Sequence, residues 1–198
     1  MKRLPVNALA GFLLKLMALN HGIHPHVHQE GAPATGRVEH GDFETFEDFF
    51  NAWRTQQKYL VGSAADLNKM LAKAHAHMRP TPFLSALMQG SMEKALDVTA
   101  GGATYNSSGT ANIGLADVTD ALMAIKTLVY DTGAASFSRL KAALDTGFRD
   151  DPELLALIQS RVPRFGSGSR DSIGTANRVA AEMHGMQVEL IERAEFGM

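Results

Sequence analysis

Residues 101–130 read GGATYNSSGTANIGLADVTDALMAIKTLVY, and the rest of the chain is interpreted around this stretch. Its first part places glycines and serines around Thr104 and Tyr105. This predicts a short strand that buries the tyrosine ring where glycine lets the backbone come close. Its second part repeats apolar residues at steps of three and four, which predicts an amphipathic helix over residues 115–130. A strand that runs into a helix is typical of an α/β core.

The apolar residues of this helix should share one face, with Leu122 and Ile125 turned to the core. The glycine cluster before it could also be interpreted as a phosphate cradle at a helix N-terminus. However, the order Gly-Gly-Ala-x-Tyr-Asn matches neither the dinucleotide fingerprint nor the P-loop, and no lysine follows to meet a phosphate. The motif therefore disfavours nucleotide binding.

The composition predicts one folding unit, residues 1–198. Of these residues 45% are hydrophobic, the net charge is −2 and there is no cysteine. A protein with this near-neutral charge has no strong positive potential that would attract nucleic acid. Residues 1–20 superficially resemble a signal peptide, but Lys15 splits the apolar run into pieces too short to span a membrane. We therefore expect a core helix there, no membrane association and a cytoplasmic protein.

Most of the remaining chain has helical periodicity. Residues 43–78 predict a helix that starts with a capping pair, Thr45 and Asp48, and is broken or bent at Gly62 and Ser63. Prolines at 80 and 82 predict a rigid break. Further helices are expected over residues 83–96, 136–146, 152–161 and 172–195. Their inward side chains would be Leu67, Met70 and Leu71 in the long helix, then Phe83, Leu84, Leu87, Met88, Met92, Leu96, Phe137, Leu140, Leu144, Ile173, Val179, Met183, Met186 and Leu190.

Four histidines lie within residues 21–28, and a cluster of imidazoles is a candidate metal site. The spacing matches no standard zinc pattern, and no cysteine or paired carboxylate completes a ligand set. A solvated loop is the favoured interpretation, with no metal site. His75 and His77 fall on different faces of the long helix and could not bind one metal together.

Four motifs occur along the chain in the order Leu19-Asn20-His21-Gly22, Gly101-Gly102-Ala103-x-Tyr105-Asn106, Asp120-x-Leu122-x-Ala124-Ile125-Lys126-x-Leu128-Val129-Tyr130 and Pro163-Arg164-Phe165-Gly166. In this order they resemble the motifs of the glycyl radical enzymes, the superfamily of pyruvate formate-lyase and the glycerol and choline lyases. The resemblance covers residues 9–179. Ala121 and Thr127 depart from the usual helix motif without touching its apolar face, and residues 167–171 replace an acidic turn.

The resemblance implies a helix-rich α/β fold, a partial segment of a ten-stranded α/β barrel in a pyruvate formate-lyase-type (PFL) domain. It implies a lyase or formate acyltransferase of anaerobic metabolism, which cleaves a C–C, C–O, C–N or C–S bond of a small substrate. The full-length family uses a protein glycyl radical installed by a radical S-adenosylmethionine activating enzyme, and is expected to be homodimeric. Tyr105 and Asn106 would lie near the barrel wall. His24 would correspond by rough position to a pocket histidine of arylacetate decarboxylases.

Neither radical residue of the family is present in this chain: it has no cysteine, and Gly197 stands outside the C-terminal glycyl signature. No residue is therefore assigned a catalytic role, no cofactor is expected in this chain, and the chain alone should be inactive. The alternative is a non-catalytic remnant or split-enzyme subunit with a structural or interaction role. Flanking DNA would distinguish the two. The motifs do not name the substrate.

Overall fold

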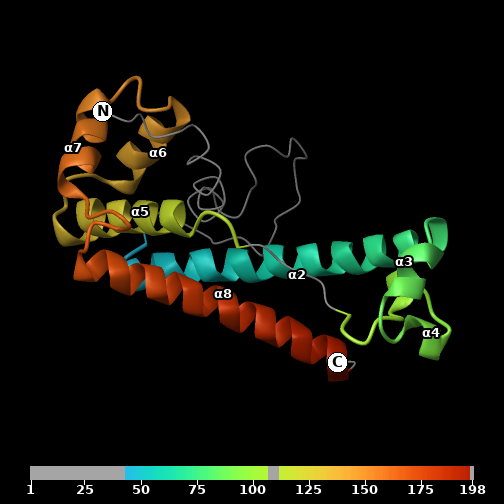
Figure 1. Cartoon of the computed structure of the whole chain (residues 1–198). Helices are drawn as coiled ribbons and strands as arrows, with labels where there is room; N and C mark the ends of the chain where they lie inside the picture. The colour runs from blue at the N-terminus through green and yellow to red at the C-terminus, as the bar shows by residue number, and fades with distance from the viewer. Residues whose placement is uncertain (1–42, 107–111, 197–198) are drawn as a thin grey trace. The chain divides into compact units, whose positions relative to one another are not determined.

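The computed structural model describes residues 43–106 and 112–196, and within these ranges it is built from helices alone (Figure 1). The helix-rich character predicted from the sequence is confirmed. The strand expected at Thr104 and Tyr105 is not formed, and both residues lie in a bend. The elements are α2 (Phe46–Met78), α3 (Pro82–Leu87), α4 (Ser91–Lys94), η1 (Val98–Ala100), α5 (Leu115–Ile125), the π-helical turn η2 (Lys126–Asp131), α6 (Phe137–Asp145), α7 (Pro152–Arg161) and α8 (Arg170–Phe196).

The chain divides into two compact units. Unit 1 comprises Met1–Leu60 and Ile113–Met198, and unit 2 comprises Val61–Asn112. The described part of unit 1 holds the first half of α2 together with α5, η2, α6, α7 and α8. The described part of unit 2 holds the second half of α2 with α3, α4 and η1. The helix expected near the N-terminus and residues 21–28 lie outside the described residues.

Helix α2 begins at the predicted capping pair. The Asp48 amide donates to Thr45 Oγ1 at 3.2 Å, and the Thr45 amide donates to Asp48 Oδ2 at 3.0 Å, so each residue satisfies a backbone donor of the other. The break expected at Gly62 and Ser63 is wrong, because α2 is continuous through both residues. A single glycine weakens a helix by only about 1 kcal/mol relative to alanine, too little to interrupt a helix of this length.

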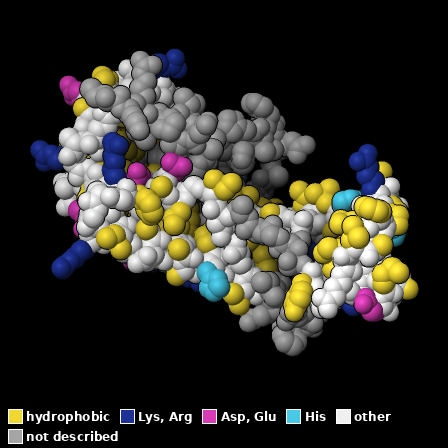
Figure 2. Space-filling view, in the orientation of Figure 1, with side chains coloured by type: hydrophobic (Ala, Val, Ile, Leu, Met, Phe, Trp, Pro, Cys, Tyr) yellow, Lys and Arg dark blue, Asp and Glu magenta, His cyan; other side chains and the backbone are white. Residues whose placement is uncertain are grey.

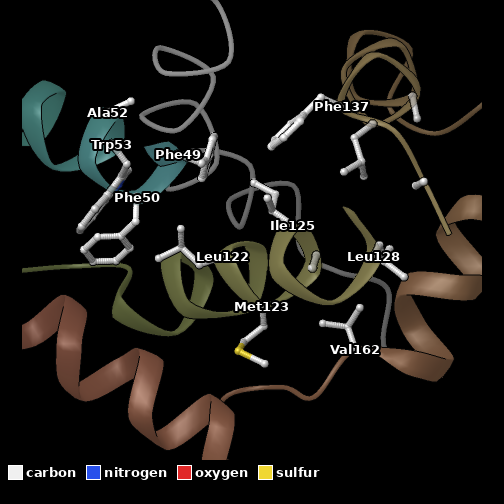
Figure 3. Close-up of a cluster of buried hydrophobic side chains, with 14 of the residues drawn as sticks. Phe49, Phe50, Ala52, Trp53, Leu122, Met123, Ile125, Leu128, Phe137 and Val162 are labelled. Carbon is white, nitrogen blue, oxygen red and sulfur yellow. The ribbon is translucent and has the colours of Figure 1, made fainter. Parts of the chain in front are cut away.

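The core of unit 1 forms around α5, whose buried side chains point to two sides (Figure 3). Leu122 and Ile125 are 0% and 2% exposed and point toward the side of Phe49, which confirms their predicted orientation. Met123 points the other way, and its sulfur accepts a hydrogen bond from Thr175 of α8 at 3.2 Å. Helix α5 therefore lies at the centre of the unit and buries both sides.

Ion pairs join the first half of α2 to α8. Arg178 donates both terminal nitrogens to Glu47 at 2.6 Å, and its guanidinium lies 3.7 Å from the centre of the Phe50 ring. Arg54 pairs with Glu182 at 3.0 Å, and Lys58 pairs with Glu189 at 2.8 Å. Because these groups are largely exposed, each pair contributes little to stability, but together they set the register of the two helices.

Helices α6 and α7, which were predicted from the sequence, start at side-chain caps. Ser136 accepts from the Arg139 amide at 3.2 Å, and Asp151 accepts from the Leu154 amide at 3.0 Å. The two helix starts are tied together, since Arg139 donates to both carboxylate oxygens of Asp151 at 2.7 and 3.0 Å. This bidentate pair holds the pKa of Asp151 below its ordinary value. Of the expected inward side chains of α8, Val179 and Met186 are buried, whereas Ile173 is half exposed.

Unit 2 differs from the sequence-based expectation, because its large apolar side chains are exposed. The residues buried in its described part are small or polar, namely Ser85, Gly90, Ser91, Gly102 and Ala103. The packing predicted for this region is therefore wrong for the chain as it stands. Helical periodicity shows which residues share a face but not whether anything covers that face. The exposed side chains are Leu67, Met70, Leu71, Met78, Phe83, Leu84, Leu87, Met88, Met92 and Leu96.

Candidate functional site

The glycine-framed loop that leads to Tyr105 is held by very close backbone approaches. A Cβ on Gly102 would lie 2.0 Å from the Leu96 carbonyl oxygen, and one on Gly90 would lie 2.7 Å from the Thr104 amide nitrogen. Gly90 also has a φ of 97°, which other residues rarely adopt. The predicted close approach beside Thr104 and Tyr105 is thus confirmed, although it builds a loop and not a strand.

Asp97 is the hydrogen-bond centre of this loop. Its carboxylate accepts from the Thr99 hydroxyl at 2.6 Å, the Thr99 amide at 2.9 Å, the Ser85 hydroxyl at 2.8 Å and the Thr81 amide at 2.8 Å. Its own carbonyl accepts from the Gly102 amide at 3.0 Å. Asp97 therefore joins the start of α3, the turn η1 and the glycine pair. The Thr99 hydroxyl bond, followed by the other donors, holds the pKa of Asp97 well below its ordinary value.

Asp97→Asn is expected to loosen this loop, because an amide has one acceptor oxygen where the carboxylate has two. Amide hydrogen exchange of residues 98–102 should accelerate by roughly tenfold or more, as expected for the loss of charge-assisted hydrogen bonds. Asp66→Asn is the matched control, since Asp66 is exposed and makes only a 3.6 Å ion pair with Lys69. Equal exchange in the two variants would contradict the role of Asp97.

The pH dependence of the same loop follows from the depressed pKa of Asp97. An acid with a folded-state pKa below its unfolded value stabilises the fold at every pH above the unfolded value, which is about 3.9 for aspartate. This contribution declines as the pH falls below the unfolded value, and it is gone once the pH has passed through the depressed pKa. Exchange protection of residues 98–102 should therefore stay constant from neutral pH to about pH 4 and decline below it.

Tyr105 and Asn106 come directly after this loop in the sequence. Thr104 is held by its amide, which donates to the Gln89 carbonyl at 2.8 Å, and by its hydroxyl, which donates to the same oxygen at 3.1 Å. The next residue, Tyr105, is 88% exposed, so the prediction that its ring is buried is wrong for this chain. Asn106 is also exposed. The loop thus presents an aromatic hydroxyl and an amide from a backbone that is fixed one residue earlier.

The third predicted site residue, His24, lies outside the described residues, as does the rest of the histidine cluster at residues 21–28. Within the described part, no group of three or more histidine or carboxylate side chains is close enough to hold a metal ion. In the same part, no helix has both the length and the apolar composition that a membrane span requires. Of the three predicted site residues, Tyr105 and Asn106 are the two that the structure describes.

The structure also brings together two motifs that are far apart in the sequence. The Phe165 amide donates to Asp120 Oδ1 at 2.6 Å, so the loop at residues 163–166 is held against α5. Sequence reasoning identified both motifs but not this contact. Asp120 lies in the second turn of α5, and spacing alone does not reveal such a pair. After α5 the chain forms the π-helical turn η2, in which Lys126 pairs with Asp131 at 2.8 Å.

The family described as pyruvate formate lyase-like matches residues 9–192 of this chain. This match covers nearly all of the fold and includes both the glycine-framed loop and α5. The chain belongs to this family of glycyl radical enzymes.

Among characterised proteins, the chain is similar to trans-4-hydroxy-L-proline dehydratase of Clostridioides difficile, with 28% identity over 151 residues. Among solved structures it is similar to a glycyl radical enzyme from Archaeoglobus fulgidus, with a TM-score of 0.75 and 27% identity over 89% of this chain and 22% of that one. It is also similar to the glycerol-bound B12-independent glycerol dehydratase of Clostridium butyricum, with a TM-score of 0.75 and 25% identity over 87% of this chain and 21% of that one.

The matches cover most of this chain but little of its relatives. The similarity to the proline dehydratase takes in 76% of this chain and 19% of that enzyme. The chain therefore spans about a fifth of the length of the relatives it matches. A protein glycyl radical fits the family. None of these 198 residues is a cysteine.

Proposed function

We propose that this chain is an internal part of a glycyl radical lyase, and that it does not perform radical chemistry alone. The observation that carries the proposal is the family match over residues 9–192, in a chain that spans only a fifth of its relatives and contains no cysteine. Hydrogen abstraction by this family needs a thiol S–H bond that breaks and forms again. The ten methionines do not substitute, because a thioether has no S–H bond.

Dehydration of a small hydroxylated substrate is the reaction branch that the relatives favour, since two of those named above are dehydratases. Cleavage of pyruvate, choline or isethionate, and the arylacetate decarboxylation suggested by His24, are the alternative branches. In the complete enzyme this chain would form part of the α/β barrel of a PFL domain. The complete enzyme would be a cytoplasmic homodimer, and its glycyl radical would be installed by a radical S-adenosylmethionine activating enzyme.

Within this chain, we assign Tyr105 and Asn106 as the residues that face the substrate side of the site. The support is geometric: the close approach at Gly102 and the two hydrogen bonds of Thr104 fix the loop, while both side chains stay exposed. A phenol and an amide supply one hydroxyl and one donor–acceptor pair, which suits a hydroxylated or zwitterionic small molecule. His24 is proposed as a third residue of the site by its position in the sequence.

The decisive experiment is anaerobic incubation of the 198-residue chain with S-adenosylmethionine and the activating enzyme of a relative, followed by electron paramagnetic resonance. We expect no glycyl doublet and no turnover in a substrate screen. The same chain produced together with the polypeptide encoded around it should give the doublet. A doublet or turnover from the chain alone would contradict the proposal.

A structural role is the alternative, and the independent core of unit 1 favours it. Sixteen buried apolar residues form one cluster there, so the described part of this unit buries a core made from this chain alone. On this alternative the chain is a remnant or a split-enzyme subunit. The coding regions beside it decide between the two: a cysteine-loop region upstream and a glycyl-loop region downstream in the same frame support the enzyme.

A further inference from the structure

The large apolar side chains of unit 2 between Leu67 and Leu96 are exposed. They are the ten large residues of α2, α3, α4 and the turns between them that were named above as exposed, from Leu67 to Leu96. We call these ten side chains the apolar surface of unit 2. Figure 2 shows hydrophobic side chains gathered over the part of the molecule that carries α3 and α4. The interior of the described part of this unit is instead held by hydrogen bonds around Asp97 and by the close packing at Gly102.

The size of this surface indicates an interface. Its members are 40–80% exposed. With about 150 Å² or more for each fully exposed large side chain, they present on the order of 1,000 Å² of apolar area. The largest apolar patch of a typical monomer is about 300–600 Å², and one side of a standard protein interface is about 800 Å². Together the ten side chains of unit 2 therefore expose an apolar area comparable to one side of a standard protein interface.

The composition of the apolar surface favours a protein partner. Four of the ten side chains are methionines, whose flexible thioethers adapt to the irregular relief of another protein surface.

We propose that the apolar surface of unit 2 is the docking surface for the remaining four-fifths of the glycyl radical enzyme, an inference that rests on the proposed function. The fold of this chain matches solved enzymes of the family over nearly its whole length, and the match covers only about a fifth of those enzymes. The exposed side chains therefore belong to a fold that, in those enzymes, is part of a much longer chain. Unit 1 buries its own aromatic residues, such as Phe49 and Trp53. In unit 2, by contrast, Phe83 and the rest of the apolar surface are exposed, and we infer that the remaining part of the enzyme covers them.

The test compares two proteins by covalent labelling with a photoactivated diazirine, read by mass spectrometry. One is the 198-residue chain, and the other is the same chain within the longer polypeptide, or set of polypeptides, encoded at its locus. Labelling of residues 78–92 should fall about tenfold in the longer protein, as expected when exposed fractions of 40–80% fall to those of a buried core.

A pair of substitutions gives a second measurement. Phe83→Ser with Leu87→Ser should leave the Tm of the 198-residue chain unchanged, because both side chains are exposed there. In the longer protein the same variant should lose about 5 °C or more, as a large-to-small change in a core does. Ala86→Ser, in the same helix, is the control for serine itself and should be nearly neutral in both proteins.

Four results would overturn the proposal, and each has its own signature. If the locus encodes neither a cysteine loop nor a glycyl loop, the proposed function fails and this inference fails with it. If both loops are encoded but residues 78–92 stay labelled in the longer protein, the docking surface alone is wrong. Protection that appears in the 198-residue chain only at high concentration, with a dimer in sedimentation, would show a second copy as occupant. Protection that persists on dilution would show that residues 1–42 cover the surface.

Discussion

Ile125→Asp is expected to unfold unit 1. Ile125 is 2% exposed at the centre of α5, and an aspartate there would lose its hydration without gaining a partner. A loss of about 4 kcal/mol or more is expected, a large part of the roughly 5–15 kcal/mol that stabilises a typical domain. Trp53 is the only tryptophan of the chain and is buried in the same core, so its fluorescence follows the denaturation of this unit.

The control for this variant is Ile113→Asp, which makes the same chemical change at a side chain that is 91% exposed. It should change the free energy of unfolding by less than about 0.5 kcal/mol, so that the denaturant midpoint stays nearly the same. The contrast separates the burial of Ile125 from any effect of the added charge. Similar midpoints for both variants would mean that α5 does not lie at the centre of the core.

Gly102→Ala is expected to disrupt unit 2. The new Cβ would lie 2.0 Å from the Leu96 carbonyl oxygen and 2.8 Å from its carbon, and these backbone atoms cannot rotate away as a side chain can. The loop must move, and the hydrogen bond from the Gly102 amide to the Asp97 carbonyl is lost with it. We expect a local destabilisation of about 3 kcal/mol, measured as faster amide exchange of residues 98–104.

Gly62→Ala is the matched control, and its sign should be opposite. A Cβ on Gly62 would meet nothing within 4 Å, and this glycine lies inside the continuous helix α2. Alanine should stabilise the helix there by about 0.5–1 kcal/mol. If Gly102→Ala were as harmless as Gly62→Ala, the close approach at the glycine pair would not hold the loop.

Most of the local structure could be predicted from the sequence, because its causes are local. The capping pair Thr45 and Asp48 fixes the start of α2, and Pro152 fixes the start of α7. The apolar steps of α5 identified Leu122 and Ile125 as core residues. The family motifs also depend only on residue order. In each case the determining interactions lie within a few residues of one another.

Features that depend on distant neighbours could not be predicted. The bend at Thr104 replaces a strand because no second strand is present in the described part to accept its backbone bonds, and the Gln89 carbonyl accepts them instead. The bond between Phe165 and Asp120 joins residues 45 positions apart. Spacing along a chain does not reveal such contacts.

The sequence by itself determined the family, the helix-rich composition and the absence of a thiol, since each of these depends only on which residues occur and in what order. The tertiary structure decided which apolar faces are covered. The face of α5 and the face of α3 have similar periodicity, yet Leu122 is buried and Phe83 is exposed. Burial is a property of the surrounding atoms, so only the fold shows that unit 1 completes its own core while unit 2 leaves its apolar surface open.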